Sequence, residues 1–118
     1  MNIKEFAQAT GISAYTIRYY EKIGIIRNVR RNSSGHRSFT SKDISWVEFI
    51  KRLKDTGMPL EQIQEYADLR EEGDHTAGSR MALLQAHAGV LAEKIRREEN
   101  HLQKLREKIT YYENLTVK

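Results

Sequence analysis

The sequence predicts a mainly α-helical fold, in which a winged helix-turn-helix with a small β-hairpin precedes a long coiled-coil helix. Three features support this prediction. Two short amphipathic patterns flank Gly11, an arginine-rich segment surrounds residues 32–35, and apolar residues recur every three or four positions from Met81 onward. The 118 residues provide for one small domain and an extension.

Capping residues delimit the first two helices. Asn2 and Glu5 have the spacing of a capping box, in which the two residues satisfy each other's backbone amides. Gly11 provides a turn, because glycine accepts backbone angles that other residues resist. Ser13 can cap the second helix by accepting a hydrogen bond from a free amide, and Gly24 ends that helix.

The second helix exposes a face that suits nucleic acid. Ile17 and Tyr20 point inward at three-residue spacing. The side chains left outside are Tyr15, Thr16, Arg18 and Tyr19. The planar guanidinium of Arg18 can donate paired hydrogen bonds to guanine or phosphate, and the hydroxyl groups can donate to phosphates. The alternative is that these residues form only a solvated basic surface.

An arginine-rich β-hairpin is predicted between Arg27 and Phe39, with a turn at residues 32–35. Its arms carry Arg27, Arg30, Arg31 and Arg37. Four arginines are costly to bring together without an anionic partner, so Arg30, Arg31 and Arg37 are expected to make salt-sensitive contacts to DNA phosphates. The alternative for each is a solvated side chain. His36, at the tip, either touches a phosphate or is only a turn residue.

Two further helices are expected to close the core. Thr40 and Asp43 form a second capping box, which opens a helix that runs through Thr56. Gly57 and Pro59 separate this helix from a shorter fourth one. The residues expected to face inward are Ile44, Trp46, Val47, Phe49, Ile50, Leu53, Leu60, Ile63 and Ala67.

The last third of the sequence follows a heptad pattern of about five repeats. Its seam consists of Met81, Leu84, Ala88, Leu91, Ile95, Leu102, Leu105, Ile109 and Tyr112. A lone helix cannot bury so narrow a stripe against a domain this small, so pairing with a second copy is expected. Glu98 interrupts the seam and either sets its register or marks where the helices diverge. The predicted division is a DNA-binding domain (1–72), a linker (73–78) and a dimerisation helix (79–116).

Charge is unevenly distributed along the chain. Residues 1–58 contain 11 Lys and Arg against 5 Asp and Glu, a net of +6. Residues 59–118 contain 9 against 11, a net of −2. The basic half predicts an anionic partner, and double-stranded DNA is the first candidate.

Composition also argues against several classes of function. The chain has no cysteine, which excludes disulfides, thiolate metal sites and thiol redox chemistry. No nucleophile–base set, phosphate-binding glycine loop or paired carboxylates indicates catalysis, so neither an enzyme nor a cofactor is expected. His75, His87 and His101 are too widely spaced to converge on a metal within one helix and are interpreted as surface residues. Without a membrane-spanning run or signal peptide, a cytoplasmic protein with no membrane contact is expected.

Two motifs together resemble the MerR family of bacterial transcription regulators. Residues 12–24, Ile-Ser-Ala-Tyr-Thr-Ile-Arg-Tyr-Tyr-Glu-Lys-Ile-Gly, match the family's most recognisable stretch. Residues 35–39, Gly-His-Arg-Ser-Phe, stand where the family usually has Gly-Tyr-Arg-x-Tyr. His36 and Phe39 replace the usual tyrosines, so hydroxyl contacts from these two positions are not expected. The resemblance covers nearly the whole chain.

This resemblance implies a homodimer whose long helices pair in antiparallel fashion. Such dimers sit on palindromic operators between promoter elements with unusually long spacing. They bend and untwist the DNA so that RNA polymerase can engage both elements. The deformation costs several kcal/mol and is offset by contacts from both wings.

Within the family, the chain is most similar to the aldehyde- and thiol-stress branch that includes AdhR and NmlR. Trp46, residues 49–58 and residues 72–76 carry this likeness. Members of the branch typically have a sensing cysteine where Arg52 stands here, and metal-sensing branches have cysteines near the end of the long helix. Neither kind of cysteine is present, so the resemblance implies DNA binding without identifying an effector.

Two other functions stay open from the sequence. An architectural or excisionase-like protein would bend DNA without regulating a promoter. A coiled-coil adaptor would use its basic half to meet an acidic protein and would show no DNA preference beyond bulk electrostatics. A small molecule bound at the junction of the DNA-binding domain, the linker and the partner helix is a further hypothesis, with Tyr66, Leu69 and His75 as candidates.

Overall fold

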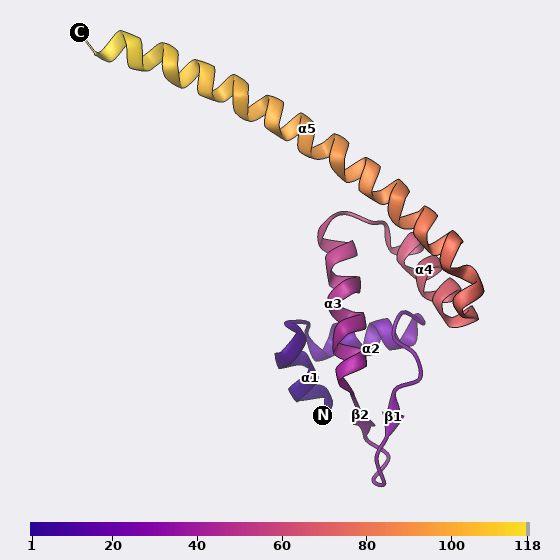
Figure 1. Ribbon diagram of the computed structural model, residues 1–118. Helices are drawn as coiled ribbons and strands as arrows, with labels where there is room; N and C mark the ends of the chain where they lie inside the picture. Colours follow the sequence, from indigo (N-terminus) through magenta and orange to yellow (C-terminus); the bar gives the residue numbers. More distant parts are fainter. Residues whose placement is uncertain (118) are drawn as a thin grey trace. The chain divides into compact units, whose positions relative to one another are not determined.

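The computed structural model describes residues 1–117 and confirms the mainly helical winged fold (Figure 1). In chain order, its elements are α1 (Ile3–Thr10), α2 (Ala14–Lys22), β1 (Arg30–Arg31), β2 (Arg37–Ser38), α3 (Ser41–Asp55), α4 (Leu60–Glu72), the 3-10 helix η1 (Asp74–Thr76) and α5 (Ala77–Thr116). The chain divides into two compact units, Met1–Leu83 and Leu84–Lys118.

The first unit has a closed apolar core. Helix α1 packs against α2 and α3, and α4 packs against α3. Phe6 of α1 stacks on Phe39, with ring centroids 4.1 Å apart and ring planes 6° apart. The other buried apolar residues are Ile17, Tyr20, Ile25, Ile26, Val47, Ile50, Leu53, Met58, Ile63, Tyr66 and Ala67. The prediction that Leu60 faces the core is wrong, since this first residue of α4 is 38% exposed.

The predicted caps are confirmed. The Asn2 side chain accepts a hydrogen bond from the Glu5 amide at 2.8 Å, and Glu5 accepts one from the Asn2 amide at 2.9 Å. Thr40 and Asp43 form the same reciprocal arrangement at the start of α3. The Ser13 hydroxyl accepts a hydrogen bond from an amide in the first turn of α2. These local bonds fix where the helices begin, and hence which side chains α2 presents outward.

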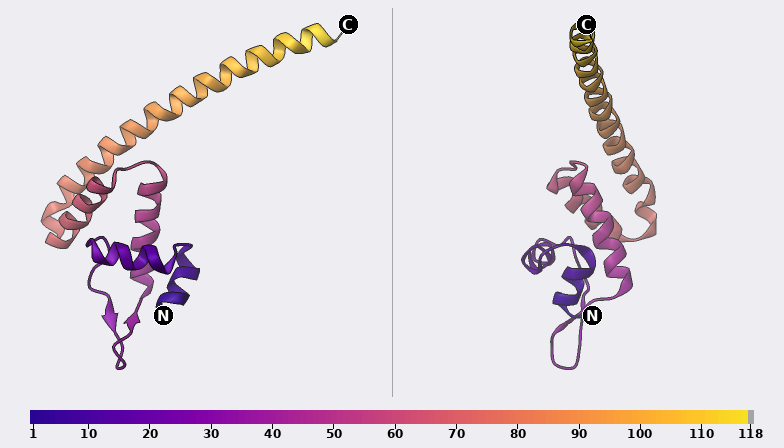
Figure 2. Two further views of the ribbon diagram at one scale, coloured as in Figure 1. Left: turned by 180° about the vertical axis from the view of Figure 1, so that it is seen from behind. Right: turned by 90° about the vertical axis from the view of Figure 1, so that its left-hand side faces the viewer.

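The hairpin is short and antiparallel. Its register pairs Arg30 with Ser38 and Arg31 with Arg37. The Asn32 side chain organises the turn by accepting hydrogen bonds from two turn amides, at 2.9 and 3.1 Å. In each view the hairpin projects from the helices of the first unit (Figures 1 and 2). This projection gives the first unit a basic wing.

Helix α5 differs from the other helices because it has no buried residue among its 40 positions, 77–116. Six seam residues are between 46% and 63% exposed: Met81, Ile95, Leu102, Leu105, Ile109 and Tyr112. The predicted linker, residues 73–78, contributes η1 and the first residues of α5. The division into domains stays a prediction. Of the helices in residues 1–117, none combines the length and apolar character needed to cross a membrane.

Candidate nucleic-acid interface

Helix α2 presents its aromatic and basic side chains on one exposed face. Ile17 and Tyr20 are buried, at 0% and 3% exposure, and they fix the orientation of the helix on the core. Residues at the intervening helical positions are therefore turned outward. Tyr15 is 79% exposed, Tyr19 is 42% exposed, and Arg18 between them is exposed as well. Side chains three and four residues apart are neighbours on a helix, so these three form a continuous surface.

The hydrogen-bonding groups on this face differ in whether other groups of the protein already bind them. Within residues 1–117, none of the ion pairs involves Arg18, so its guanidinium is not engaged by a carboxylate of the protein. Thr16 is half-buried, and its hydroxyl accepts a hydrogen bond from Ser13 at 3.0 Å. Arg18 is therefore better placed than Thr16 to bind a phosphate or a base edge.

A carboxylate connects α2 to the wing. Arg37 Nε donates to Glu21 Oε1 at 2.6 Å and to Oε2 at 3.3 Å. A terminal nitrogen of Arg31 lies 3.9 Å from Glu21 Oε2. The Glu21 side chain is only 21% exposed, so this cluster is less screened by water than an open surface pair. Glu21 thus holds both strands of the wing beside α2.

The structure separates the predicted wing residues into two groups. Arg30, Arg31 and His36 are exposed, whereas Arg37 is half-buried and uses its Nε in the bond to Glu21. The assignment of Arg27 to a wing arm is wrong. Arg27 precedes β1, and its guanidinium forms an ion pair with the Asp68 carboxylate of α4. Contacts from the wing residues to DNA stay a prediction.

The role of Glu21 was not predicted from the sequence, although a signal for it exists. Glu21 is the one acidic residue between Glu5 and Asp43. An isolated carboxylate in a strongly basic segment indicates an internal partner for a nearby arginine. The pairing of Arg27 with Asp68 has no comparable signal, since the two residues lie 41 positions apart.

The other candidate residues are spread over the fold. Within residues 1–117 there is no group of three or more His, Cys, Asp or Glu side chains arranged to hold a metal ion. Tyr66 lines an open groove of about 410 Å³ together with Trp46, Phe49 and Arg70, among others. Neither Leu69 nor His75 is among the residues that line this groove. The hypothesis of a small molecule on these three residues stays a prediction.

Comparison with known proteins identifies the fold. Residues 1–69 match the family model "MerR HTH family regulatory protein", and residues 44–111 match "MerR, DNA binding". The transcriptional regulator AdhR of Bacillus subtilis is 43% identical over 84 residues, which cover 71% of this chain and 60% of AdhR. This chain therefore aligns with less than two thirds of that relative's length.

Solved structures agree with the family models. A structure described as a MerR family transcriptional regulator from Listeria monocytogenes has a TM-score of 0.90 and 38% identity, covering 96% of this chain and 86% of that one. HiNmlR, a MerR family regulator lacking the sensor domain and bound to promoter DNA, has a TM-score of 0.85 and 34% identity, covering 96% and 90%.

These similarities bear on two predictions from the sequence. The relatives include AdhR and an NmlR protein, which confirms the resemblance to that branch. They are named as transcriptional regulators, which agrees with the prediction that the chain is not an enzyme. The two family models together span residues 1–111, and the chain belongs to the MerR family of helix-turn-helix regulators.

Proposed function

We propose that this chain is a cytoplasmic, dimeric transcription regulator that binds a specific DNA sequence. The observation that carries the proposal is the exposed face of α2, where Tyr15, Arg18 and Tyr19 lie together and a basic wing is tied to the same helix by Glu21. A helix-turn-helix places its second helix in the major groove, and flanking basic residues bind phosphates. The promoter DNA bound by HiNmlR supports the same partner for this chain.

The dimer is proposed from the exposed seam of α5. Seam residues such as Leu105 and Ile109 are 63% and 56% exposed, and they recur at the three- and four-residue steps of a coiled coil. A helix with an uncovered apolar stripe gains stability when a second copy covers it. Two copies bring two α2 helices and two wings to one duplex, so the operator is expected to be palindromic.

We further propose that the dimer distorts promoter DNA between two promoter elements, so that RNA polymerase can engage both. This step rests on membership of the MerR family. The chain contains no cysteine, so the proposed function includes no thiol sensor.

Footprinting tests the proposal. The full chain is incubated with its own upstream region and with a scrambled duplex of equal length at physiological salt. Protection of a palindrome between promoter elements is expected, with affinity falling by about 10³-fold or more from 50 to 200 mM salt if six or more phosphates are contacted. Equal binding to the scrambled duplex would contradict sequence-specific regulation and favour the adaptor.

Transcription in vitro separates regulation from DNA architecture. Addition of the chain to RNA polymerase on the footprinted promoter is expected to change transcript yield. A control promoter whose spacing between elements has the ordinary length should respond differently. Protection of the palindrome without any change in transcription would contradict the promoter role and support an architectural protein.

A further inference from the structure

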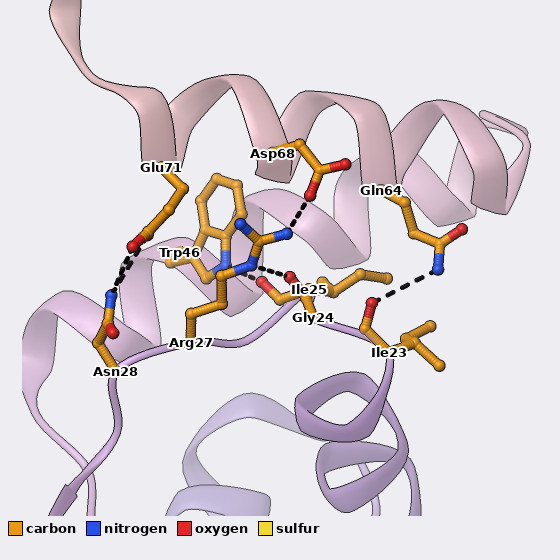
Figure 3. Close-up of polar contacts among 9 residues, drawn as sticks. All are labelled: Ile23, Gly24, Ile25, Arg27, Asn28, Trp46, Gln64, Asp68 and Glu71. Carbon is orange, nitrogen blue, oxygen red and sulfur yellow. Dashed lines mark hydrogen bonds and ion pairs between the residues drawn. The ribbon is translucent and has the colours of Figure 1, made fainter.

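The segment between the recognition helix α2 and the wing is fastened to two other helices. Residues 23–28, here called the connector, run from the end of α2 towards β1. Figure 3 shows side chains of α3 and α4 that reach the connector. The wing can move relative to α2 only if the connector moves, so these contacts bear on the geometry of the DNA-contacting surface.

Three contacts come from α4. The Arg27 guanidinium pairs with the Asp68 carboxylate. The Asn28 side-chain amide donates to both oxygens of Glu71, each at 3.2 Å. The Gln64 amide lies 3.5 Å from the carbonyl oxygen of residue 23, at the other end of the connector. Helix α4 therefore contacts the connector at both ends (Figure 3).

One contact comes from α3. The indole N–H of Trp46 donates to the Ile25 carbonyl oxygen at 2.8 Å. The Trp46 ring stacks near Tyr66, with centroids 5.9 Å apart, and the Arg70 guanidinium lies 4.0 Å from its centroid. The Ile25 side chain is 1% exposed, so the middle of the connector is anchored in the core.

The last residue of the connector adopts an unusual backbone conformation. Asn28 has a φ of +58° and is the one non-glycine residue with positive φ among residues 1–117. Asparagine tolerates this left-handed region better than most residues but still prefers others. The bonds from Asn28 to Glu71 therefore hold the chain in a conformation that local preferences alone do not fix, two residues before β1 begins at Arg30.

We infer that Asp68 and Glu71 of α4 are positioning residues for the wing, an inference that rests on the proposed DNA-binding function. They hold Arg27 and Asn28 at the end of the connector, while Glu21 of α2 holds Arg37 of β2. The position of the wing relative to α2 is thus restrained at two places. Neither carboxylate needs to touch DNA, and both would repel it.

Two variants of α4 that lose the same charge separate the effect of the contacts on DNA affinity from the effect of charge. The double variant Asp68→Ala/Glu71→Ala loses both contacts. The control Glu65→Ala/Glu72→Ala loses the same two charges from exposed positions of the same helix. Removing carboxylates raises affinity for DNA by itself, so the control should bind slightly more tightly than wild type. The contact variant is expected to bind about fivefold more weakly than this control. Equal affinity of the two variants would overturn the inference.

A double-mutant cycle shows whether the effect passes through the wing. In a background that carries Arg30→Ala and Arg31→Ala, the wing has lost its two exposed arginines, and the α4 variant should have little further effect. In an Arg18→Ala background the full loss should persist, because α2 contacts the DNA independently. Equal losses in both backgrounds would contradict a role in placing the wing.

Amide hydrogen exchange provides a readout without DNA. In Asp68→Ala/Glu71→Ala the backbone amides of β1 and β2 should exchange faster than in the control, while those of α1 stay protected. The variant Asn28→Gly, which tolerates the same φ without the side-chain bonds, should behave in the same way. Unchanged exchange in the wing would overturn the positioning role. If wild type binds no DNA but the wing amides respond as expected, the proposed function fails and the positioning role stands.

Discussion

The two units of this chain differ in where their apolar side chains lie. In Met1–Leu83, Phe6, Ile17 and Ile50 are 0% exposed, whereas in Leu84–Lys118 the seam residues Leu105 and Ile109 are 63% and 56% exposed. Helices owe most of their stability in proteins to packing of an apolar face. The first unit therefore closes its core with its own residues, while the second is expected to need another chain.

A core truncation should break the first unit and spare the second. Phe6→Ala removes one ring of the Phe6–Phe39 stack and is expected to lower the free energy of unfolding by about 3–5 kcal/mol. Chemical unfolding followed by near-ultraviolet circular dichroism measures this loss, and sedimentation measures assembly. Tyr15→Ala is the control, because Tyr15 is 79% exposed and should change stability by less than about 0.5 kcal/mol. Loss of assembly in Phe6→Ala would contradict the independence of the two units.

A charge in the seam should disrupt assembly through the second unit and spare the first unit. Leu105→Asp places a carboxylate twice in each proposed dimer and is expected to raise the dimer Kd about 100-fold, or about 2.7 kcal/mol. Sedimentation equilibrium of the full chain measures the change. Val90→Asp is the matched control, because Val90 is 67% exposed but lies outside the heptad seam. If both substitutions weaken assembly equally, the predicted seam is wrong.

The exposed face of α2 should matter for DNA but not for assembly. Arg18→Ala is expected to weaken operator binding by about 1–3 kcal/mol, because a lost base or phosphate contact of a guanidinium has this magnitude. Mobility-shift titration at fixed salt measures the affinity. Arg97→Ala removes the same charge from an exposed position of α5 and should have little effect. Unchanged operator affinity in Arg18→Ala would remove this residue from the interface.

Substitutions at two glycines, one in each unit, are expected to have small effects of opposite sign. Gly89 lies inside α5 in open space, so Gly89→Ala should stabilise that helix by about 0.5–1 kcal/mol. Gly35 in the wing also has open space but a φ of +79°, so Gly35→Ala should destabilise its turn by about 1 kcal/mol. Thermal unfolding measures the first, and amide exchange of the wing measures the second. If both substitutions changed stability in the same direction, backbone conformation would not decide the effect of replacing a glycine.

The fold was predictable wherever a signal is local in the sequence. The capping pairs Asn2–Glu5 and Thr40–Asp43 specify helix starts from residues three apart, and the structure has both. Gly11, with a φ of +71°, provides the turn before α2. The buried pair Ile17 and Tyr20 followed from helical periodicity. In each case the responsible residues lie within one helical turn or one loop.

The missed features depend on residues far apart in the sequence. Arg37 meets Glu21 across 16 positions, and Arg27 meets Asp68 across 41. Such pairs exist only after α2, the wing and α4 have been brought together by the core. Composition shows an excess of arginine but does not show which arginines the protein itself neutralises. The set of candidate DNA contacts therefore includes Arg37, whose Nε is already bonded within the protein.

The anchoring of the connector by Trp46 has an optical consequence. Trp46 is the one tryptophan of the sequence, and its indole donates to the Ile25 carbonyl while the Arg70 guanidinium lies over its ring. An indole that loses its hydrogen-bond acceptor and a stacked cation changes the wavelength and yield of its ultraviolet emission. No other indole in the chain contributes to that emission. The intrinsic fluorescence of Trp46 therefore reports on the connector before the wing. Motion of the connector can be followed in real time without a label.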